Sequence, residues 1–327
     1  MILAGDIGGT HTRLALLEAR DGRLIIVAED TFSSREFASL EAVLRKFLAS
    51  RPLPFAHACF GIAGPVRNGR CDATNLPWVV ESSLVADELA LESVGLINDL
   101  EANAWGIAVL EAKDFVVLNQ GASDASGNAA IISAGTGLGE AGLHWDGKDH
   151  RPFATEGGHS DFAPRNHLEV ELLEYLLKQF QRVSYERVVS GPGLLNIYRF
   201  LRDSGRGEEP PWLAEQMRAE DPGAVISRAA LKGTSELCAQ ALDLFVSVYG
   251  AEAGNLALKI MATGGVFLGG GIAPKILQKL MESGFLNAFT AKGRMKPLLH
   301  AMPVRVILND KTALLGAARF AALCPVE

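Results

Sequence analysis

The feature that most limits the fold of this chain is a glycine turn near its start, Gly5-Asp6-Ile7-Gly8-Gly9-Thr10. Apolar runs flank it at Met1–Ala4 and Leu14–Leu17, so the segment predicts a β-hairpin with an exposed backbone tip. Glycine has no Cβ and reaches positive φ, so the N–H groups of such a tip can approach an anion closely. The carboxylate of Asp6 could hold a divalent cation, directly or through water. The turn indicates a nucleotide site, and a plain hairpin turn is the alternative.

A second strand, glycine turn and strand occur in the middle of the chain. The apolar run Ala129–Ser133 leads into Gly135-Thr136-Gly137-Leu138-Gly139, and a further strand is predicted over Ala141–Trp145. A third turn, Gly269-Gly270-Gly271, follows the apolar residues Val266–Leu268. The repetition predicts two lobes of related topology, with phosphate held between two hairpin tips and the third turn placed to take the nucleoside.

The order of the apolar patterns predicts an α/β fold. Residues 1–33 are typical of three strands, and a serine-capped helix is expected over Ser39–Leu48. Strands then alternate with helices, which favours a mainly parallel sheet preceded by an antiparallel ribbon. Helices are expected over 168–181, 191–202 and 224–262, and a late strand over Val304–Leu308, followed by a last helix, could return to the first lobe.

Two common nucleotide-binding patterns do not fit the glycine turns. A dinucleotide fingerprint needs a helix directly after its glycines, whereas the residues after Gly139 are typical of a strand. The pattern Gly-x-x-x-x-Gly-Lys-Ser/Thr occurs nowhere in the sequence. The Rossmann and P-loop interpretations are therefore rejected.

Composition excludes several classes of protein. The 327 residues are 48% hydrophobic and carry a net charge of −7, so a nucleic acid is not an expected partner. The four cysteines, Cys59, Cys71, Cys238 and Cys324, are scattered, which argues against a structural zinc or a disulfide framework. No signal peptide and no segment able to span a membrane is visible. We expect a soluble cytoplasmic protein.

Three polar clusters are candidates for a substrate site. Asn98-Asp99 lies between a short apolar run and a helical pattern, so it could cap the helix, face a substrate, or do both. Glu156-Gly157-Gly158-His159 predicts a tight turn with the carboxylate and imidazole on one rim, better suited to a polyhydroxylated ligand than to zinc. Glu186 opens the next helical pattern, where an acid would also interact favourably with the helix dipole.

Together these residues resemble the bacterial glucokinase family of the sugar kinase/actin-like ATPase superfamily, over nearly the full chain. The first two glycine turns look like its phosphate motifs, and Gly269-Gly270-Gly271-Ile272 like its adenosine motif. Ile97-Asn98-Asp99 resembles the catalytic segment. The sugar-binding signatures are matched by Glu156–His159 with Asp161-Phe162-Ala163-Pro164, and by Glu186-Arg187-Val188 with Ser190-Gly191-Pro192-Gly193.

The resemblance implies a two-lobed actin-like ATPase fold, also described as ribonuclease H-like, with an active-site cleft between a small and a large domain. The expected small domain covers 1–109 and 300–327, and the large domain 110–299. The implied reaction is phosphorylation of glucose by ATP, with Asp99 as general base. Glucose would be bound by Asn98, Asp99, Glu156, His159 and Glu186. ATP would be held by Asp6, Gly8, Gly9, Thr10, Gly135, Thr136, Gly137, Gly270 and Gly271.

The resemblance further implies Mg²⁺, with Asp6 in its outer coordination shell, and a homodimer. Two departures from the family pattern are Thr155, where glycine is common, and His11, where asparagine is common. A kinase for mannose, fructose or an N-acetylhexosamine remains an alternative. An actin-like or chaperone-type ATPase would explain the glycine turns but not the polar clusters. A transcriptional regulator of this ancestry would need an N-terminal helix-turn-helix, and here the hairpin begins at residue 2.

Overall fold

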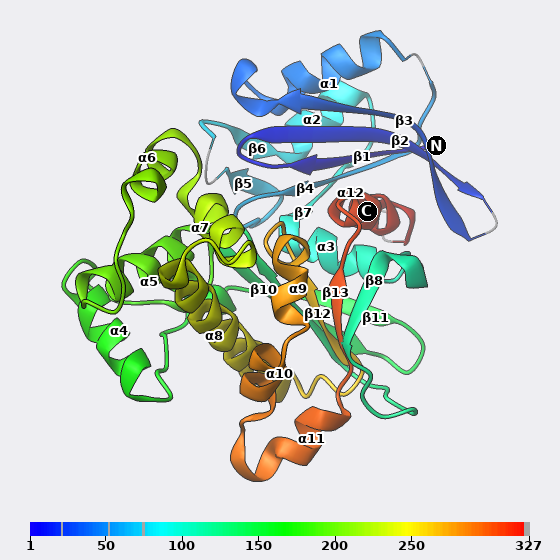
Figure 1. Ribbon diagram of the computed structural model, residues 1–327. Coiled ribbons are helices and arrows are strands. Elements are labelled where there is room, and N and C mark those ends of the chain that lie inside the picture. Colours follow the sequence, from blue (N-terminus) through cyan, green and yellow to red (C-terminus); the bar gives the residue numbers. More distant parts are fainter. Residues whose placement is uncertain (21, 52, 74–75, 324–327) are drawn as a thin grey trace. The chain divides into compact units, whose positions relative to one another are not determined.

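The computed structural model describes residues 1–20, 22–51, 53–73 and 76–323, whose contacts divide the chain into two units (Figure 1). Unit 1 comprises Met1–Asp114, Arg151–Ala154 and Asn309–Glu327, and unit 2 comprises Phe115–His150 and Thr155–Leu308. Strands and helices alternate along the chain, so the α/β fold class is confirmed. None of the helices in this described part of the chain is long and apolar enough to cross a membrane.

A five-stranded sheet in the order β3-β2-β1-β4-β7 forms the centre of unit 1. Its strands are β1 (Ile2–Ile7), β2 (His11–Arg20), β3 (Arg23–Ser33), β4 (His57–Ile62) and β7 (Gly95–Asn98). Strands β1, β2 and β3 are antiparallel, whereas β1, β4 and β7 run parallel. This arrangement confirms the predicted antiparallel ribbon that leads into a parallel sheet. Asp21 lies outside the described residues.

Helices cover both faces of this sheet because its strands alternate apolar side chains between two cores. On one face, Leu3 and Ile7 pack with α1 (Leu40–Ala49) and α2 (Ser82–Leu89). On the other, Ile2 and Ala4 pack with α3 (Asp99–Ile107) and the C-terminal helix α12 (Thr312–Leu323), which lies beside the blue strands in Figure 1. A small antiparallel pair, β5 (Arg70–Asp72) and β6 (Val79–Glu81), completes this unit.

A six-stranded mixed sheet in the order β11-β10-β9-β12-β13-β8 forms the centre of unit 2, to which all of its residues belong except Arg151–Ala154 of β11. Its strands are β8 (Phe115–Asn119), β9 (Ala129–Ala134), β10 (Leu138–Trp145), β11 (His150–Thr155), β12 (Gly265–Gly269) and β13 (Val304–Ile307). Its helices are α4 (His167–Leu177), α5 (Gly191–Asp203), α6 (Pro211–Ala219), α7 (Pro222–Leu231), α8 (Glu236–Ile260), α9 (Leu277–Leu280), α10 (Ser283–Thr290) and α11 (Lys296–Ala301). Buried residues of the sheet and of α5, α7 and α8 share one core.

Two predictions about these elements are wrong. The pattern over 224–262 forms two helices, because Gly233 takes a positive φ of 64° after α7 and Ser235 caps α8. Of the late strand and helix expected to return to the first lobe, only the helix α12 does so, since β13 pairs with β12 and β8 in unit 2. Residues 300–308 thus fall in unit 2, whereas the expected small domain included them.

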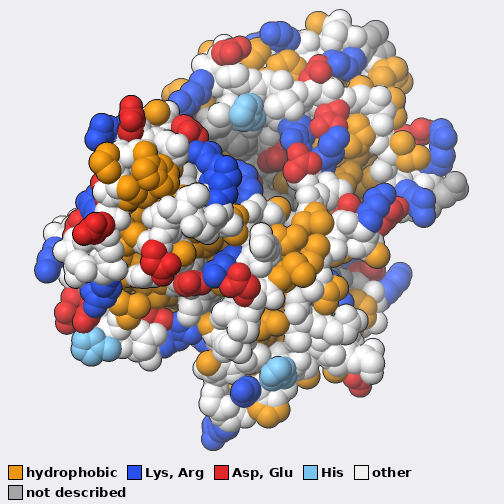
Figure 2. All heavy atoms as spheres, in the orientation of Figure 1, with side chains coloured by type: hydrophobic (Ala, Val, Ile, Leu, Met, Phe, Trp, Pro, Cys, Tyr) orange, Lys and Arg blue, Asp and Glu red, His pale blue; other side chains and the backbone are white. Residues whose placement is uncertain are grey.

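Among the described residues, Cys59, Cys71 and Cys238 are buried and form no disulfide bond, and Cys324 lies outside the described residues. Acidic and basic side chains are interspersed on the face of the molecule seen in Figure 2. A surface of this kind lacks the single-sign stripe that marks many polyanion-binding proteins.

Candidate active site

The candidate residues divide between the two units. Unit 1 holds the first glycine turn and the Asn98-Asp99 pair, and unit 2 holds the second and third glycine turns with the two sugar-binding signatures. Within each unit, residues far apart in the sequence come together.

The first glycine turn is the tip of the β1–β2 hairpin, as predicted. The N–H of Gly8 donates to the carbonyl of His11 at 2.9 Å and closes the turn. From outside the hairpin, the hydroxyl of Ser34 donates to the carbonyl of Gly8 at 2.8 Å and contacts the hydroxyl of buried Thr12 at 3.0 Å. Because Ser34 holds the backbone of the tip on one side, the exposed side of the tip is available to a ligand.

Asp6 and Asp99 lie at the same edge of the sheet in unit 1. The register pairs Ile7 with Ile62 and Ile62 with Asn98, so the carboxyl ends of β1, β4 and β7 are level. Burial, followed by the negative charge of Asp99, raises the pKa of Asp6 to about 6, although nearby Arg13 acts to lower it. The edge is thus an acidic site in which the charge of Asp99 acts on the carboxylate of Asp6.

This acidic edge suits a divalent cation. A cation near Asp6 would offset both the burial of its carboxylate and the repulsion from Asp99. Among residues 1–20, 22–51, 53–73 and 76–323, no group of three or more His, Cys, Asp or Glu side chains could hold a metal. Mg²⁺ usually keeps several waters and takes only one or two carboxylates plus substrate phosphates, so the carboxylate of Asp6 is a suitable outer-shell partner for it.

Asn98 is the N-cap of α3, as its position suggested. Its side-chain oxygen accepts from the N–H of Leu100 at 2.9 Å and of Glu101 at 3.4 Å, and its amide nitrogen donates to the carbonyl of Gly64 at 3.0 Å. The carboxylate of Asp99 accepts from the N–H of Leu100 at 2.9 Å. The capping interpretation is thus confirmed, and it leaves one amide hydrogen of Asn98 for a substrate.

A glycine in β4 lets the start of α3 approach the sheet. A Cβ at Gly61 would lie 2.7 Å from the Cβ of Ala102 and 3.8 Å from the Cα of Asp99. Such a separation is too short for two carbon atoms, so any side chain here would push α3 away. The first turn of that helix, with Asp99, is therefore held close to β4, the strand that pairs with β1 and hence lies next to Asp6.

The second glycine turn closes the β9–β10 hairpin in unit 2. These strands are antiparallel, with Ala134 opposite Leu138, and the N–H of Gly135 donates to the carbonyl of Gly137 at 2.9 Å. The strand that follows confirms the rejection of a dinucleotide fingerprint. A Cβ on Gly135 would meet no atom within 4 Å, so this part of the turn is open.

Glu186 braces this hairpin. It lies in a short 3₁₀ turn, Tyr185–Arg187, rather than at the start of the helix, which begins at Gly191. One of its carboxylate oxygens accepts from the N–H of Leu138 at 3.0 Å and lies 2.5 Å from where a Cβ of Gly137 would be. The second sugar-binding signature and the second glycine turn are thus in direct contact.

The third glycine turn lies next to the second. The N–H of Ile272 donates to the carbonyl of Ala134 at 3.2 Å, and Gly270 takes a positive φ of 79°. A Cβ on Gly270 would clash with the same carbonyl, so glycine is required for this approach.

A cavity of about 470 Å³ opens beside these two turns, entirely within unit 2. It is lined from the two turns by Gly135, Thr136, Gly271 and Ile272, and from three helical segments by Gly191, Pro192, Leu194, Asp221, Gly223, Ala224, Ser227, Lys275 and Ile276. Its size fits a small organic ligand, and the exposed turn at Gly135 and Thr136 is suited to phosphates at one end. The sequence predicted the glycines that line this cavity. It did not predict the lining residues from α7, because the local pattern around Asp221-Pro222-Gly223 does not show which part of the fold the start of that helix approaches.

Glu156 and His159 share one rim of a tight turn, as predicted. Residues Gly157–His159 form a 3₁₀ turn, and the two side chains approach to 3.9 Å while remaining 68% and 55% exposed. Arg182 fixes the turn by donating to the carbonyl of His159 at 2.6 Å and to Asp161 at 2.8 Å. A fixed backbone with two exposed polar side chains suits a ligand with several hydroxyl groups.

The chain matches the family model described as Glucokinase over residues 3–323. A protein named Glucokinase from Nostoc sp. is 46% identical, over 98% of this chain and 99% of its own length. A crystal structure of glucokinase from an Antarctic psychrotroph superimposes with a TM-score of 0.85 at 33% identity, covering 98% of each chain. A glucokinase of the ROK family from Streptomyces griseus, solved with glucose and AMPPNP, has a TM-score of 0.68 at 22% identity and covers 98% of this chain and 99% of its own. The chain belongs to the Glucokinase family.

Proposed function

We propose that this protein transfers the γ-phosphoryl group of ATP to the 6-hydroxyl of glucose. The proposal rests on the contact between Glu186 and the β9–β10 turn. Within one unit, this contact places a glycine turn that suits phosphate groups next to a carboxylate that suits sugar hydroxyl groups. The name of the relative from Nostoc sp. supports the same reaction.

ATP is the proposed phosphoryl donor. The cavity beside Gly135 and Gly271 would take the nucleoside, and the turn residues Gly8, Gly9, Thr10, Gly135, Thr136 and Gly137 would donate N–H and hydroxyl hydrogens to the phosphates. Phosphoryl transfer requires mainly positioning and charge stabilisation. Mg²⁺, when bound, would supply positive charge at the β- and γ-phosphates, and Asp6 would hold it through water.

Asp99 is the proposed general base, and it accepts the proton of the attacking hydroxyl. Its backbone is fixed as the first residue of α3, since Asn98 caps that helix. A positioned base of this kind contributes roughly 10²–10⁴-fold in rate.

Glu156, His159, Glu186 and Asn98 are the proposed ligands of the remaining sugar hydroxyls. Each of them has a fixed backbone and at least one polar atom that its structural contacts leave available. A sugar of the wrong epimer would leave such groups unpaired, at a cost of roughly 1–3 kcal/mol for each group. Glu156→Gln should therefore raise the KM for glucose strongly, and an unchanged KM would remove Glu156 from the site.

A panel of hexoses tests the substrate. ADP release is measured with glucose, mannose, fructose and N-acetylglucosamine at equal concentration. We expect glucose to give the highest kcat/KM by at least about tenfold, the discrimination that one unpaired polar group produces. A higher value for another sugar would contradict the glucose assignment, and equal ATP turnover without any sugar would favour an actin-like ATPase. The homodimer and the cytoplasmic location remain predictions.

A further inference from the structure

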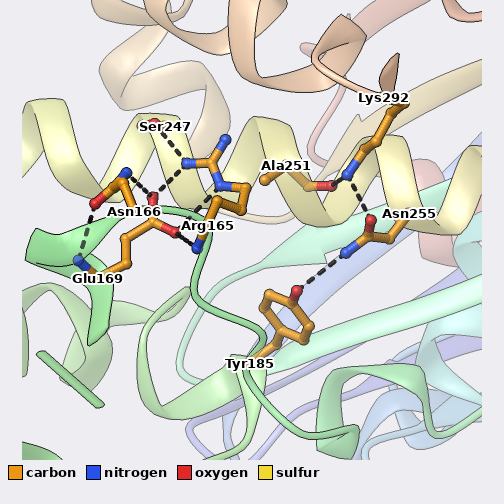
Figure 3. A network of polar contacts seen from close by, with 8 residues as sticks. All are labelled: Arg165, Asn166, Glu169, Tyr185, Ser247, Ala251, Asn255 and Lys292. Carbon is orange, nitrogen blue, oxygen red and sulfur yellow. Dashed lines mark hydrogen bonds and ion pairs between the residues drawn. The ribbon is translucent and has the colours of Figure 1, made fainter. Parts of the chain in front are cut away.

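A network of buried polar groups lies behind the sugar-binding turns of unit 2. Part of it is drawn in Figure 3, where Lys292 donates to Asn255 at 2.5 Å and to the carbonyl of Ala251 at 2.8 Å. The side chain of Asn255 continues the network to Tyr185 at 3.0 Å and to Glu252 at 2.7 Å. Buried networks of this kind require that every member finds a partner.

Two carboxylates at the centre of this network have no role in the proposed reaction. Glu140 on β10 is 1% exposed and Glu252 on α8 is fully buried, and the two carboxyl groups are close enough for the charge of Glu252 to raise the pKa of Glu140. Glu252 also lies 3.6 Å from the ammonium group of Lys259. Among the described residues, one oxygen of Glu140 has no hydrogen-bond partner. Two buried carboxylates in contact cannot both be ionised without strong repulsion, so the pair is stable when it shares a proton.

Glu140 supports the turn that carries Glu156 and His159. A Cβ added at Gly157 would clash with the carboxylate of Glu140, so the backbone of this turn lies directly against that side chain. The hydroxyl of Thr155 donates to the carbonyl of Glu140 at 2.8 Å and accepts from the N–H of Gly157 at 3.2 Å. Any shift of the Glu140 carboxylate would displace the turn.

Glu252 supports the turn that carries Glu186. The side-chain nitrogen of Asn255 donates to the hydroxyl of Tyr185 at 3.0 Å and to Glu252 at 2.7 Å, so Asn255 connects the two. The N–H of Tyr185 donates to the carbonyl of Ser160 at 2.9 Å, which connects this turn to the end of the first one. The pair thus underlies both turns, from β10 on one side and from α8 on the other.

We propose that Glu140 and Glu252 share a proton in a hydrogen bond, and that this buried pair acts as a positioning device that holds both sugar-binding turns in the arrangement that binds glucose. This inference rests on the proposed assignment of the two turns to glucose. Neither carboxylate touches the substrate, and their effect is on its binding rather than on the transfer step.

The charges around the pair set its dependence on pH. Burial, followed by the charge of Glu252, raises the pKa of Glu140 to about 8, whereas Lys259 lowers it. Burial lowers the pKa of Lys292 to about 8, with Arg165 acting in the same direction. Above that pH, Glu140 gains a negative charge and Lys292 loses a positive one. Both changes leave repulsion within the pair, so glucose binding should weaken.

The test measures the KM for glucose and kcat between pH 6 and pH 9 at saturating Mg-ATP. In the unchanged protein the KM should rise about five- to tenfold from pH 7 to pH 9, as expected for loss of one required proton with a pKa near 8. In Glu140→Gln, whose amide cannot ionise but still donates a hydrogen bond to Glu252, the rise should be less than twofold. A rise in Glu140→Gln equal to that of the unchanged protein would overturn the proposal.

Two further variants separate this proposal from its alternatives. Glu169→Gln is the control, because Glu169 is equally buried but pairs with Arg165 at the start of α4. It should lower stability and keep the pH-dependent rise in KM, and loss of the rise in this variant would also overturn the proposal. Glu156→Gln tests the glucose assignment itself. If it raises the KM while Glu140→Gln leaves the pH profile unchanged, only the positioning role is wrong.

Discussion

Asp6 and Asp99 show how surroundings separate two carboxylates at one sheet edge. Asp6 precedes the hairpin tip and has a raised pKa, whereas Asp99 begins a helix and accepts from a backbone N–H. An acid at a helix start interacts favourably with the helix dipole, which agrees with the proposed role of Asp99 as a base. Asp6 lies in β1 rather than at a helix start, and a cation would stabilise its ionised form. This difference supports the roles proposed for Asp6 and Asp99.

Replacing Asp6 by asparagine should stabilise the free protein and disable it. The pKa of Asp6 is raised from 3.8 to about 6, so the folded state binds the proton more tightly than the unfolded chain. Its contribution to stability is present below about pH 4 and is lost as the pH rises through about 6. At pH 8 the ionised side chain costs up to about 3 kcal/mol, which asparagine avoids.

Thermal unfolding at pH 8 without nucleotide or Mg²⁺ measures this effect. We expect Asp6→Asn to raise Tm by a few degrees, to lower turnover with Mg-ATP by at least about a hundredfold, and to bind glucose normally. A collapse of glucose binding would contradict the separation of roles between Asp6 and Asp99.

Asn98 allows its two proposed roles to be separated. Asn98→Ser retains a capping oxygen but loses the amide, so it should raise the KM for glucose with a stability loss of less than about 0.5 kcal/mol. Asn98→Ala also loses the cap and should cost about 1 kcal/mol more in the free energy of unfolding. Urea unfolding and steady-state kinetics measure both quantities. A normal KM in the serine variant would mean that Asn98 is only a cap.

At the scale of the elements, α3 is held by close backbone contacts on two sides. Gly61 allows α3 to pack closely against the sheet. Gly106 of α3 and Gly316 of α12 allow these two helices to pack closely, since a Cβ on either glycine would clash with a backbone carbonyl of the opposite helix. The position of Asp99 therefore depends on small residues that take no part in the chemistry.

Gly316→Ala should lower the free energy of unfolding by about 1–3 kcal/mol, the usual cost of overpacking. Gly284→Ala is the matched control, because Gly284 also lies in a helix but its Cβ would meet only one atom, 3.9 Å away. That variant should be neutral or slightly stabilising, since alanine favours helix. Equal effects of the two substitutions on Tm would contradict the packing argument.

Elements determined by local pattern were the ones that the sequence predicted correctly. The hairpin at Gly8 closes through neighbouring residues, and the start of α3 follows from the Asn98 cap. The break between α7 and α8 had a local signal in Gly233 and Ser235 that could have been used. The sheet of β13 could not be predicted, because an apolar run such as Val304–Ile307 pairs equally well with many strands.

At the scale of the whole molecule, the chain completes unit 2 before its last helix returns to unit 1. The cavity assigned to the nucleoside lies in unit 2 alone, whereas the proposed base is in unit 1. The contact between Glu186 and the β9–β10 turn joins parts of unit 2 that the sequence placed in separate motifs. Such a contact depends on tertiary packing, so no local pattern contains it.

Filling the cavity should affect only the nucleotide. A Cβ on Gly271 would meet no atom within 4 Å, and its φ is not positive, so Gly271→Leu should fold normally. We expect the KM for ATP to rise at least about tenfold, which corresponds to about 1.4 kcal/mol, with an unchanged Tm and a KM for glucose within twofold. An unchanged KM for ATP would place the nucleoside elsewhere.

The assignment of Asp99 as general base is the central claim, and Asp99→Asn tests it most directly. Asparagine still accepts from the N–H of Leu100 but cannot take a proton, so the fold and glucose binding should persist. The measurement is kcat with saturating glucose and Mg-ATP, with glucose affinity determined by calorimetry on the same sample. The account predicts that kcat falls by roughly 10²–10⁴-fold while the affinity changes only a few-fold. Turnover within a few-fold of the unchanged protein would contradict it.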